Sequence, residues 1–209
     1  MNYVEKIKKF KAENKGLMSE NQYLHVGHLL NDMKPCNFLI FGLGEDSFLW
    51  NDINSGGKCV FLEDNLEWIE KFKNSGLDIR SIVYNTHVSD FENLVNDEKR
   101  LQLDLPNDVK STAWDLVLVD APLGHGPINP SLGRGSGRPF NGPGRMSSIF
   151  EASRLVRRNG MVIIDDLGRL AESIYAVNYF GNEAVVVENK LGFFDNRHNK
   201  NAGYYTAEG

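Results

Sequence analysis

Residues 37–47, NFLIFGLGEDS, decide the fold. The stretch begins as a short apolar run, reaches Gly42 and Gly44, and continues into DSFLWNDI (46–53), which has the spacing of a short helix. A strand that turns through glycines into a helix opens a doubly wound α/β domain, and the missing side chains let a ligand approach the backbone. A tight turn without a ligand fits the glycines equally well until their context is considered.

The same strand-and-helix pattern recurs along the chain, which predicts a parallel sheet covered by helices. A long loop rich in glycine and proline, residues 121–144, precedes the helix RMSSIFEASRLVRRNG (145–160), for which Gly160 is the expected stop. A further helix is expected near residues 169–179. The strands that repeat the pattern are expected at KCVFLE (58–63), IRSIVYN (79–85), WDLVLVD (114–120) and MVIID (161–165).

Both ends of the chain add to this core. The N-terminal residues 1–35 read as two helices, and Ser19 with Gln22 forms a capping-box pattern that opens the second at Glu20. Near the C-terminus, EAVVVENK (183–190) and GYYTA (203–207) read as an antiparallel hairpin. We therefore expect one domain over residues 1–209, with an α/β core over 36–209. A late hairpin after five strand-helix units resembles the S-adenosylmethionine-dependent methyltransferase variant of the Rossmann-like fold, with a mostly parallel seven-stranded sheet.

Composition sets limits on the partners. The chain has 209 residues and a net charge of -5, which argues against binding through phosphate neutralisation, so no nucleic-acid partner is expected. No apolar run approaches the ~20 residues that cross a bilayer, and the N-terminus lacks the apolar core of a signal peptide. We expect a cytoplasmic protein with no membrane partner and with Cys36 and Cys59 as free thiols.

The glycine turn and the next strand end suggest a nucleoside site. No Gly-Lys-Ser/Thr follows the glycines, and Ser47 replaces the third glycine of a dinucleotide fingerprint, so a nucleoside without a pyrophosphate fits better. Glu63 ends the second strand roughly 20 residues after the glycines, where a carboxylate binds ribose hydroxyls. Asp64 beside it is the alternative ligand. Residues 84–86 (Tyr84, Asn85 and Thr86) are expected near the adenine or as ordinary strand-end residues.

Three aspartates close the fourth and fifth strands. Asp120 follows one strand, and Asp165 with Asp166 follows the other. If the strands are neighbours the carboxylates converge, which requires a cation or protons to compensate their repulsion. All-oxygen ligands suit Mg²⁺ or Mn²⁺, so a divalent metal that orients a substrate hydroxyl is one hypothesis. Helix capping by Asp165 or Asp166 is the other.

The loop 121–144 supplies candidates for the reaction. Methyl transfer from a sulfonium requires an acceptor oxygen held in line and a group that takes its proton. His125 is the predicted base because histidine titrates in the useful range, although a loop histidine is also commonly a solvent-exposed bystander. Asp120 is the second predicted catalytic residue. Arg138 and Arg145 are expected to bind the acceptor from a closing loop.

Several segments in order resemble the plant glucuronoxylan 4-O-methyltransferase family, also called the polysaccharide-biosynthesis domain: CNFLIFGLGEDSFLW, GGKCVFLEDNLEWI, WDLVLVDAPLG and GPGRMSSIF. The resemblance implies that S-adenosyl-L-methionine methylates a sugar hydroxyl in a glycan, and it gives Gly42, Gly44, Glu63 and Asp120 cofactor and pocket roles. The Arg- and Gly-rich loop departs from the plant pattern. The Asp165-Asp166 pair instead resembles metal-dependent sugar methyltransferases of macrolide pathways.

The acceptor stays open on this resemblance. The short chain is also similar to a methyltransferase domain of a large-virus glycan-synthesis protein, for which rhamnose or another deoxyhexose is the implied acceptor and the host cytoplasm the location. Glucuronic acid is the acceptor that the plant family implies. A non-catalytic glycan-biosynthesis factor on the same fold is the main alternative function, and a nicotinamide-dependent oxidoreductase is the second.

Overall fold

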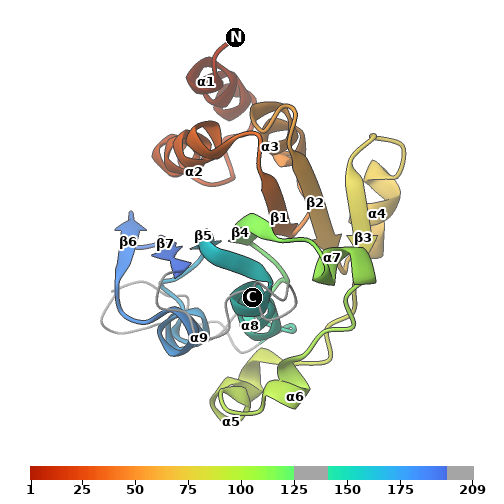
Figure 1. Cartoon of the computed structure of the whole chain (residues 1–209), viewed down its shortest axis with the longest axis vertical. Coiled ribbons are helices and arrows are strands. Elements are labelled where there is room, and N and C mark those ends of the chain that lie inside the picture. Colours follow the sequence, from red (N-terminus) through yellow and green to blue (C-terminus); the bar gives the residue numbers. More distant parts are fainter. Residues whose placement is uncertain (125–140, 197–209) are drawn as a thin grey trace.

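A computed structural model of the chain describes residues 1–124 and 141–196 (Figure 1). Its seven-stranded sheet has the strand order β3-β2-β1-β4-β5-β7-β6. The first five strands in this order are parallel, and β7 is antiparallel to both β5 and β6. The strands are β1 (Asn37–Phe41), β2 (Lys58–Glu63), β3 (Asp78–Ser81), β4 (Trp114–Val119), β5 (Val156–Ile164), β6 (Ala184–Val187) and β7 (Leu191–Asp195).

The register brings the carboxyl ends of the central strands to one edge. Phe41 is level with Leu62 of β2 and with Val119 of β4. Hydrogen bonds continue past these ends, because the amide of Gly42 donates to the Leu62 carbonyl (2.8 Å) and that of Asp120 to the Phe41 carbonyl (2.9 Å). The order reverses beside β1, and this is where open α/β sheets bind ligands.

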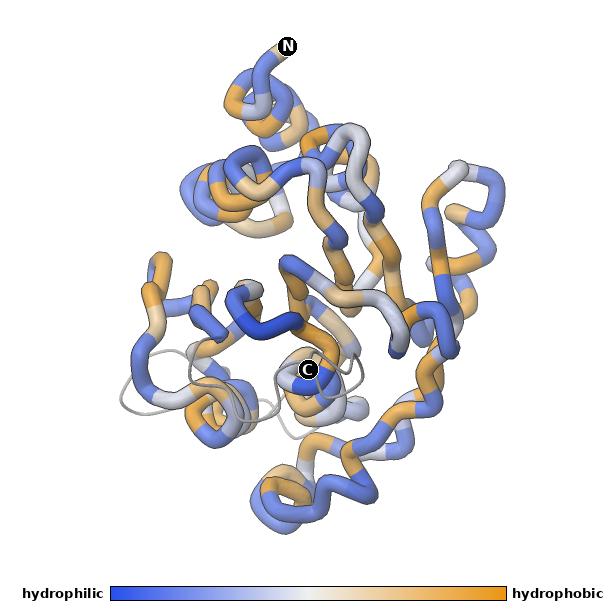
Figure 2. The backbone as a smooth tube through the Cα atoms, viewed as in Figure 1, coloured by the Kyte–Doolittle hydropathy of each residue, from blue (hydrophilic) through white to orange (hydrophobic). Residues whose placement is uncertain are grey.

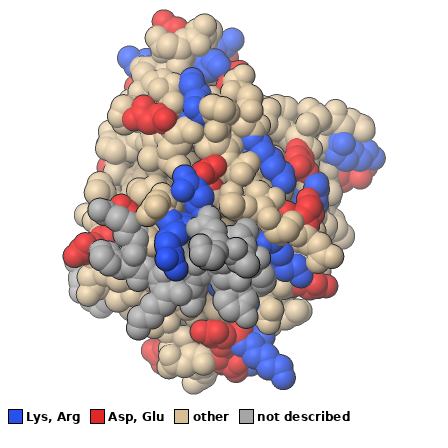
Figure 3. All heavy atoms as spheres, viewed as in Figure 1, with Lys and Arg blue, Asp and Glu red and all other residues tan. Residues whose placement is uncertain are grey.

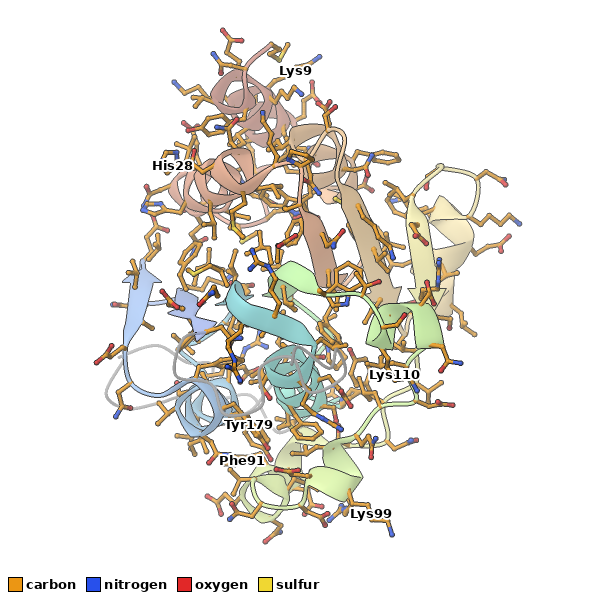
Figure 4. All side chains as sticks on the ribbon, in the orientation of Figure 1. Lys9, His28, Phe91, Lys99, Lys110 and Tyr179 are labelled. Atoms are coloured by element: carbon orange, nitrogen blue, oxygen red, sulfur yellow. The ribbon has the colours of Figure 1, made fainter. Side chains whose placement is uncertain are left out.

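The sheet separates two apolar cores. Alternate side chains of β1 point to opposite faces: Phe38 and Ile40 pack against α1 to α4, while Leu39 and Phe41 pack on the side of α5 to α9. Figure 2 shows hydrophobic residues recurring along the strands, and Figure 4 shows His28 on one side of the sheet with Phe91 and Tyr179 on the other. The molecule is thus a three-layer sandwich of helices, sheet and helices.

The helices start where the sequence predicts at the N-terminus. Ser19 accepts a hydrogen bond from the Gln22 amide while the Gln22 side chain accepts one from the Ser19 amide, which completes the predicted capping box. The helices are α1 (Tyr3–Glu13), α2 (Glu20–Met33), α3 (Ser47–Ile53), α4 (Leu66–Phe72), α5 (Phe91–Leu94), α6 (Glu98–Leu101), α7 (Asn107–Lys110), α8 (Met146–Leu155) and α9 (Leu170–Phe180), with a 3-10 turn at Val88–Asp90.

The expectation that Gly160 stops the helix after the loop is wrong. Helix α8 ends at Leu155, and β5 begins at Val156, so Gly160 lies inside the strand. The strand carries an irregularity at this point: Asn159 has φ of 88°, and the pairing with β4 shifts register between Trp114 and Leu116. The polar residues that read as a helix end therefore form a bulged strand.

The predicted C-terminal hairpin exists, but its second strand is not the expected one. Strand β7 is LGFFD (Leu191–Asp195), which the sequence suggested was a loop, and GYYTA lies outside the described residues. Glu188 and Asn189 both have positive φ (55° and 52°), as in the two-residue turns that suit the twist of a hairpin. Three residues, 188–190, connect the two strands, and Leu191 already pairs with Val187.

Two other segments also differ from expectation. Strand β3 ends at Ser81 rather than reaching residue 85, and the segment that follows it forms the 3-10 turn, α5 and α6 rather than one continuous helix. In the described part of the chain, no helix is long and apolar enough to cross a membrane.

Candidate active site

A cavity of about 860 Å³ opens at the carboxyl ends of β1, β2, β4 and β5. The glycine turn after β1 forms its floor, and residues 16–18 with Tyr23 of α2 line it from the N-terminal side. Acidic side chains outnumber basic ones in its wall: Glu45, Asp46, Glu63, Asp64, Asp120, Asp165 and Asp166 face Arg145, Arg169 and Lys190. Seven of the predicted site residues therefore lie together in one cavity: Gly42, Gly44, Glu63, Asp120, Arg145, Asp165 and Asp166.

The backbone amides of the glycine turn already have partners within the protein. Gly42 donates to the Leu62 carbonyl at 2.8 Å, Leu43 to Glu63 Oε2 at 2.8 Å, and Gly44 to Ser47 Oγ at 3.0 Å. Gly42 has φ of 125°, and an added Cβ would lie 3.3 Å from that of Ala121, so a glycine is needed there. Because its amides are used, this turn differs from one whose free amides cradle a phosphate.

Glu63 is held at the end of β2 and is 5% exposed. Its Oε1 accepts from the amides of Asp64 (3.0 Å) and Asn65 (2.8 Å), and its Oε2 accepts from Leu43. Burial raises the pKa of Glu63, and the three amide donors oppose that rise. The carboxylate thereby ties the glycine turn to the loop after β2. A carboxylate accepts about four hydrogen bonds, so Glu63 keeps about one acceptor site beyond these three amides.

The three aspartates converge as predicted, and the compensating cation is an arginine. Arg145 is 5% exposed; its Nη2 lies 3.0 Å from Asp120 Oδ1 and 3.1 Å from Asp166 Oδ2. Its Nη1 donates to the Asp165 carbonyl at 2.7 Å and lies 3.7 Å from Asp165 Oδ2. A buried guanidinium with its planar set of donors suits several carboxylates at once.

Two further cations complete this cluster at its rim. Lys190, in the hairpin turn, lies 3.2 Å from Asp165 Oδ1 and 3.7 Å from Asp166 Oδ1. Arg169 lies 2.7 Å from Asp166 Oδ2, and its Nη1 also donates to the Gly124 carbonyl at 2.6 Å. The charges of the cluster are therefore balanced mainly around Asp165 and Asp166.

The aspartates differ in exposure and in pKa. The side chain of Asp120 is 36% exposed, against 5% for Asp165 and 17% for Asp166. Burial of the carboxylate in this enclosed site and the nearby charge of Asp165 raise the pKa of Asp120 well above its usual range, although Arg145 opposes them. For Asp166, burial is outweighed by Arg145 and Arg169, which lower its pKa. Of these three aspartates, Asp120 has the most exposed side chain, and its pKa is raised.

The geometry of the described residues does not fit a bound divalent ion. In residues 1–124 and 141–196, no group of three or more His, Cys, Asp or Glu side chains is arranged to hold a metal. Arg145 instead lies between the three carboxylates that the metal hypothesis used. The metal role of Asp120, Asp165 and Asp166 stays a prediction, and no step of the chemistry below depends on it.

Sequence reasoning missed several residues of the cavity, among them Arg169 and Lys190 of the charge cluster and the pair Asp46 and Tyr23. Asp46 precedes α3 but its side chain makes no capping hydrogen bond, and it accepts from the Tyr23 hydroxyl at 2.9 Å. Burial raises the pKa of Asp46, and hydrogen bonds from Tyr23, from its own backbone amide and from the Trp50 side chain oppose that rise. Asp46 is visible in the motif FGLGEDS, but nothing in the sequence links it to Tyr23, which lies 23 positions earlier.

Other predicted residues lie elsewhere. His125 and Arg138 fall outside the described residues. Tyr84 shares a 2.8 Å hydrogen bond with Ser148, Thr86 donates to the Pro143 carbonyl at 3.2 Å, and Asn85 is exposed. Tyr84 thus connects the segment after β3 to α8, and Thr86 connects it to the segment just before α8. Their proximity to adenine stays a prediction.

Acidic and basic side chains are interspersed over the face of the molecule in Figure 3. Among the described residues on this face, no extended basic surface is visible, which gives no support for binding a phosphate backbone.

The strand order, the antiparallel β7 and the cavity beside β1 define the fold of S-adenosylmethionine-dependent methyltransferases. A solved structure with this fold, the 16S rRNA N2 G1207 methyltransferase of T. thermophilus in complex with AdoMet and guanosine, matches with a TM-score of 0.52. The match covers 88% of this chain and 45% of that one at 13% identity, so it bears on the fold alone.

Within this fold, the chain belongs to the IRX15/IRX15L/GXM family, whose sequence profile matches residues 24–103 and 97–194. It is 35% identical to glucuronoxylan 4-O-methyltransferase 2 of Arabidopsis thaliana over 176 residues, covering 72% of this chain and 56% of that protein. It is 32% identical to arabinogalactan O-methyltransferase 2 of the same plant, covering 71% and 56%. The chain thus spans about half the length of the curated relatives it matches. The family resemblance expected from the sequence is confirmed.

Proposed function

We propose that this protein transfers a methyl group from S-adenosyl-L-methionine to a hydroxyl of a sugar in a glycan. The cavity at the carboxyl edge of the sheet carries the proposal, because it combines a glycine turn without free amides, a ribose-type acid and an acidic wall. Two of the relatives are named as O-methyltransferases of glucuronoxylan and arabinogalactan, which supports a glycan acceptor.

The charge of the cavity favours a sulfonium cofactor over a nicotinamide dinucleotide. A dinucleotide brings an anionic pyrophosphate, which needs free amide donors at the turn, whereas the amides of Gly42, Leu43 and Gly44 are all in use. An excess of carboxylates instead attracts a cationic cofactor. The oxidoreductase alternative is therefore disfavoured.

Each residue of the site has a part in this reaction. Glu63 accepts hydrogen bonds from the ribose hydroxyls, and Gly42 and Gly44 let the cofactor lie close to the backbone. The acceptor oxygen attacks the methyl carbon in line as the carbon-sulfur bond breaks, and the electron pair of that bond goes to sulfur, giving the thioether. Asp120 takes the proton of the hydroxyl, helped by its raised pKa.

Arg145 holds Asp120 in position for this proton transfer through the 3.0 Å ion pair. Its guanidinium is enclosed by the aspartates, so we assign it first to positioning the carboxylates. The predicted contacts of Arg145 and Arg138 with the acceptor, and of His125 as an alternative base, remain part of the proposal. Rhamnose, another deoxyhexose and glucuronic acid are the candidate acceptors.

A non-catalytic role in glycan biosynthesis is the second candidate. The family description includes IRX15, a name that states no activity. The fold by itself does not require that the protein catalyse a reaction. The cavity with its partly exposed Asp120 favours the enzyme.

Calorimetric titration with S-adenosylhomocysteine is the first test, because it needs no knowledge of the acceptor. Binding supports the proposal and justifies screening sugar acceptors with labelled cofactor, with Asp120→Asn as the inactive control. Absence of binding in a folded sample contradicts the proposal and favours the non-catalytic role.

A further inference from the structure

The carboxylate of Asp46 differs from those of Asp120, Asp165 and Asp166 in the same cavity in having no ion pair among the described residues. Asp120, Asp165 and Asp166 pair with Arg145, and Glu63 accepts three backbone amides. Within the described ranges, no basic side chain forms an ion pair with Asp46. Its neighbour Glu45, by contrast, is paired with Lys71.

The usual structural reason for an aspartate at this position is absent. An aspartate before a helix commonly accepts a hydrogen bond from an amide of the first turn, but the Asp46 side chain makes no such bond to α3. One carboxylate oxygen, Oδ2, accepts from the Tyr23 hydroxyl at 2.9 Å, and the carboxylate is also hydrogen-bonded by the Trp50 side chain and by its own backbone amide. The other, Oδ1, lies 3.0 Å from the position of a Cβ on Gly44, so it occupies the space that this glycine leaves open.

Tyr23 itself is fixed in place by the N-terminal helices. Its ring is fully buried and stacks on Trp50 with ring centroids 5.3 Å apart, while Phe10 packs on it edge-on at 5.4 Å. A buried tyrosine needs a partner for its hydroxyl, and Asp46 supplies it. Helix α2 thereby holds the Asp46 carboxylate at the cavity wall.

The position of Asp46 along the sheet edge matches one end of the proposed cofactor. Glu63, the ribose ligand, lies at the end of β2, the glycine turn with Asp46 follows β1, and Asp120 follows β4. With the ribose on Glu63 and the methyl group directed toward Asp120, the amino-acid end of the cofactor lies over the turn after β1. That end carries an α-ammonium group.

We propose that Asp46 binds the α-ammonium group of the amino-acid end of S-adenosylmethionine, and that the Tyr23 hydroxyl positions its carboxylate. This inference rests on the proposed function and names a residue pair that joins the N-terminal helix to the cofactor site. A cationic donor satisfies a carboxylate that otherwise lies in an enclosed wall without a counter-charge.

The test compares two ligands that differ only at the ammonium: S-adenosylhomocysteine and its deamino analogue, which has hydrogen in place of the amino group. Calorimetry of the whole chain gives the ratio of the two dissociation constants. We expect the wild-type protein to prefer S-adenosylhomocysteine by about 10- to 100-fold, as for a charge-assisted hydrogen bond. Asp46→Asn should lose most of this preference, to within about threefold, while binding the deamino analogue as the wild type does.

Glu45→Gln is the matched control, because it removes an adjacent acid of the same cavity that already has Lys71 as its partner. Its preference should equal that of the wild type. Tyr23→Phe keeps the charge and removes the hydroxyl, so its preference should fall between those of the wild type and Asp46→Asn.

The outcomes separate the two proposals. If the wild-type protein binds both ligands equally well, or if Asp46→Asn keeps the full preference, the ammonium is bound elsewhere and the role of Asp46 is wrong while the methyltransferase proposal stands. If Asp46→Asn does not fold, the wild-type ratio and Tyr23→Phe still decide. If the folded wild type binds neither ligand, both proposals fail.

Discussion

One guanidinium nitrogen of Arg145 joins two strand ends: Nη2 lies 3.0 Å from Asp120 after β4 and 3.1 Å from Asp166 after β5. Arg145 and Asp120 both line the cavity. The arrangement places a permanent positive charge where three carboxylates would otherwise repel one another. It therefore concerns both the stability of the domain and the behaviour of Asp120.

Replacing Arg145 should be strongly destabilising. Arg145→Met leaves buried carboxylates without their partner, and we expect a loss of about 3 to 5 kcal/mol in the free energy of unfolding, measured by urea denaturation. Arg157→Met is the control, because its pair with Asp115 is more exposed, and it should cost less than about 1 kcal/mol. Equal losses in the two variants would refute the assignment of Arg145 as the organising cation.

The pH dependence of methyl transfer should distinguish the two candidate bases. The base must be deprotonated, so the rate falls as the pH drops through its pKa. Because burial and Asp165 raise the pKa of Asp120, we expect this acidic limb at a higher pH than an ordinary aspartate gives. Rate profiles of His125→Ala should keep the limb, and Asp120→Asn should lower the rate by about 100-fold or more. A limb that disappears in His125→Ala would make His125 the base.

The two glycines of the turn should respond differently to substitution. Gly42 has φ of 125°, so Gly42→Ala strains the backbone and should cost about 1 to 3 kcal/mol of stability. Gly44 has an ordinary φ, and its nearest obstacle is the end of the Asp46 side chain at 3.0 Å. Gly44→Val should thus fold but lose S-adenosylhomocysteine binding in calorimetry. Unchanged affinity would remove the cofactor from this turn.

Manganese should not stabilise the wild-type protein. Since Arg145 lies between the aspartates, a divalent ion finds no set of free ligands among the described residues. The melting temperature should not change when Mn²⁺ is added, and chelation should leave S-adenosylhomocysteine affinity unaltered. A rise of the melting temperature with Mn²⁺ would restore the metal hypothesis, and Asp165→Asn would then test its ligands.

The sequence was sufficient for the central sheet because β1, β2 and β4 are buried on both faces and read as continuous apolar runs. It was insufficient for the hairpin. Strand β7 contains Gly192 and Asp195, which read as loop residues, and the turn before it has positive φ at Glu188 and Asn189 rather than at glycines. Their conformation depends on the pairing of the strands, which no local pattern states.

The residues of the site likewise divide into those that the sequence predicts and those that it does not. Glu63, Asp120 and the Asp165-Asp166 pair follow strands, and strand ends converge by topology alone. The partners of these acids come from other layers: Tyr23 from α2 and Lys190 from the hairpin. The need for a compensating charge was evident from the acids, but no local pattern places Arg145 among them.

The place of Lys190 in the chain has a consequence for synthesis on the ribosome. Strand β7 enters the sheet between β5 and β6, and the turn that carries Lys190 reaches back to Asp165 and Asp166. A nascent chain that has emerged only as far as α9 already holds these two acids but not this lysine. Among the described residues, the acidic cavity therefore gains the charge of Lys190 only after the β6-β7 hairpin has closed, so a partly synthesised chain lacks this contribution to neutralising Asp165 and Asp166.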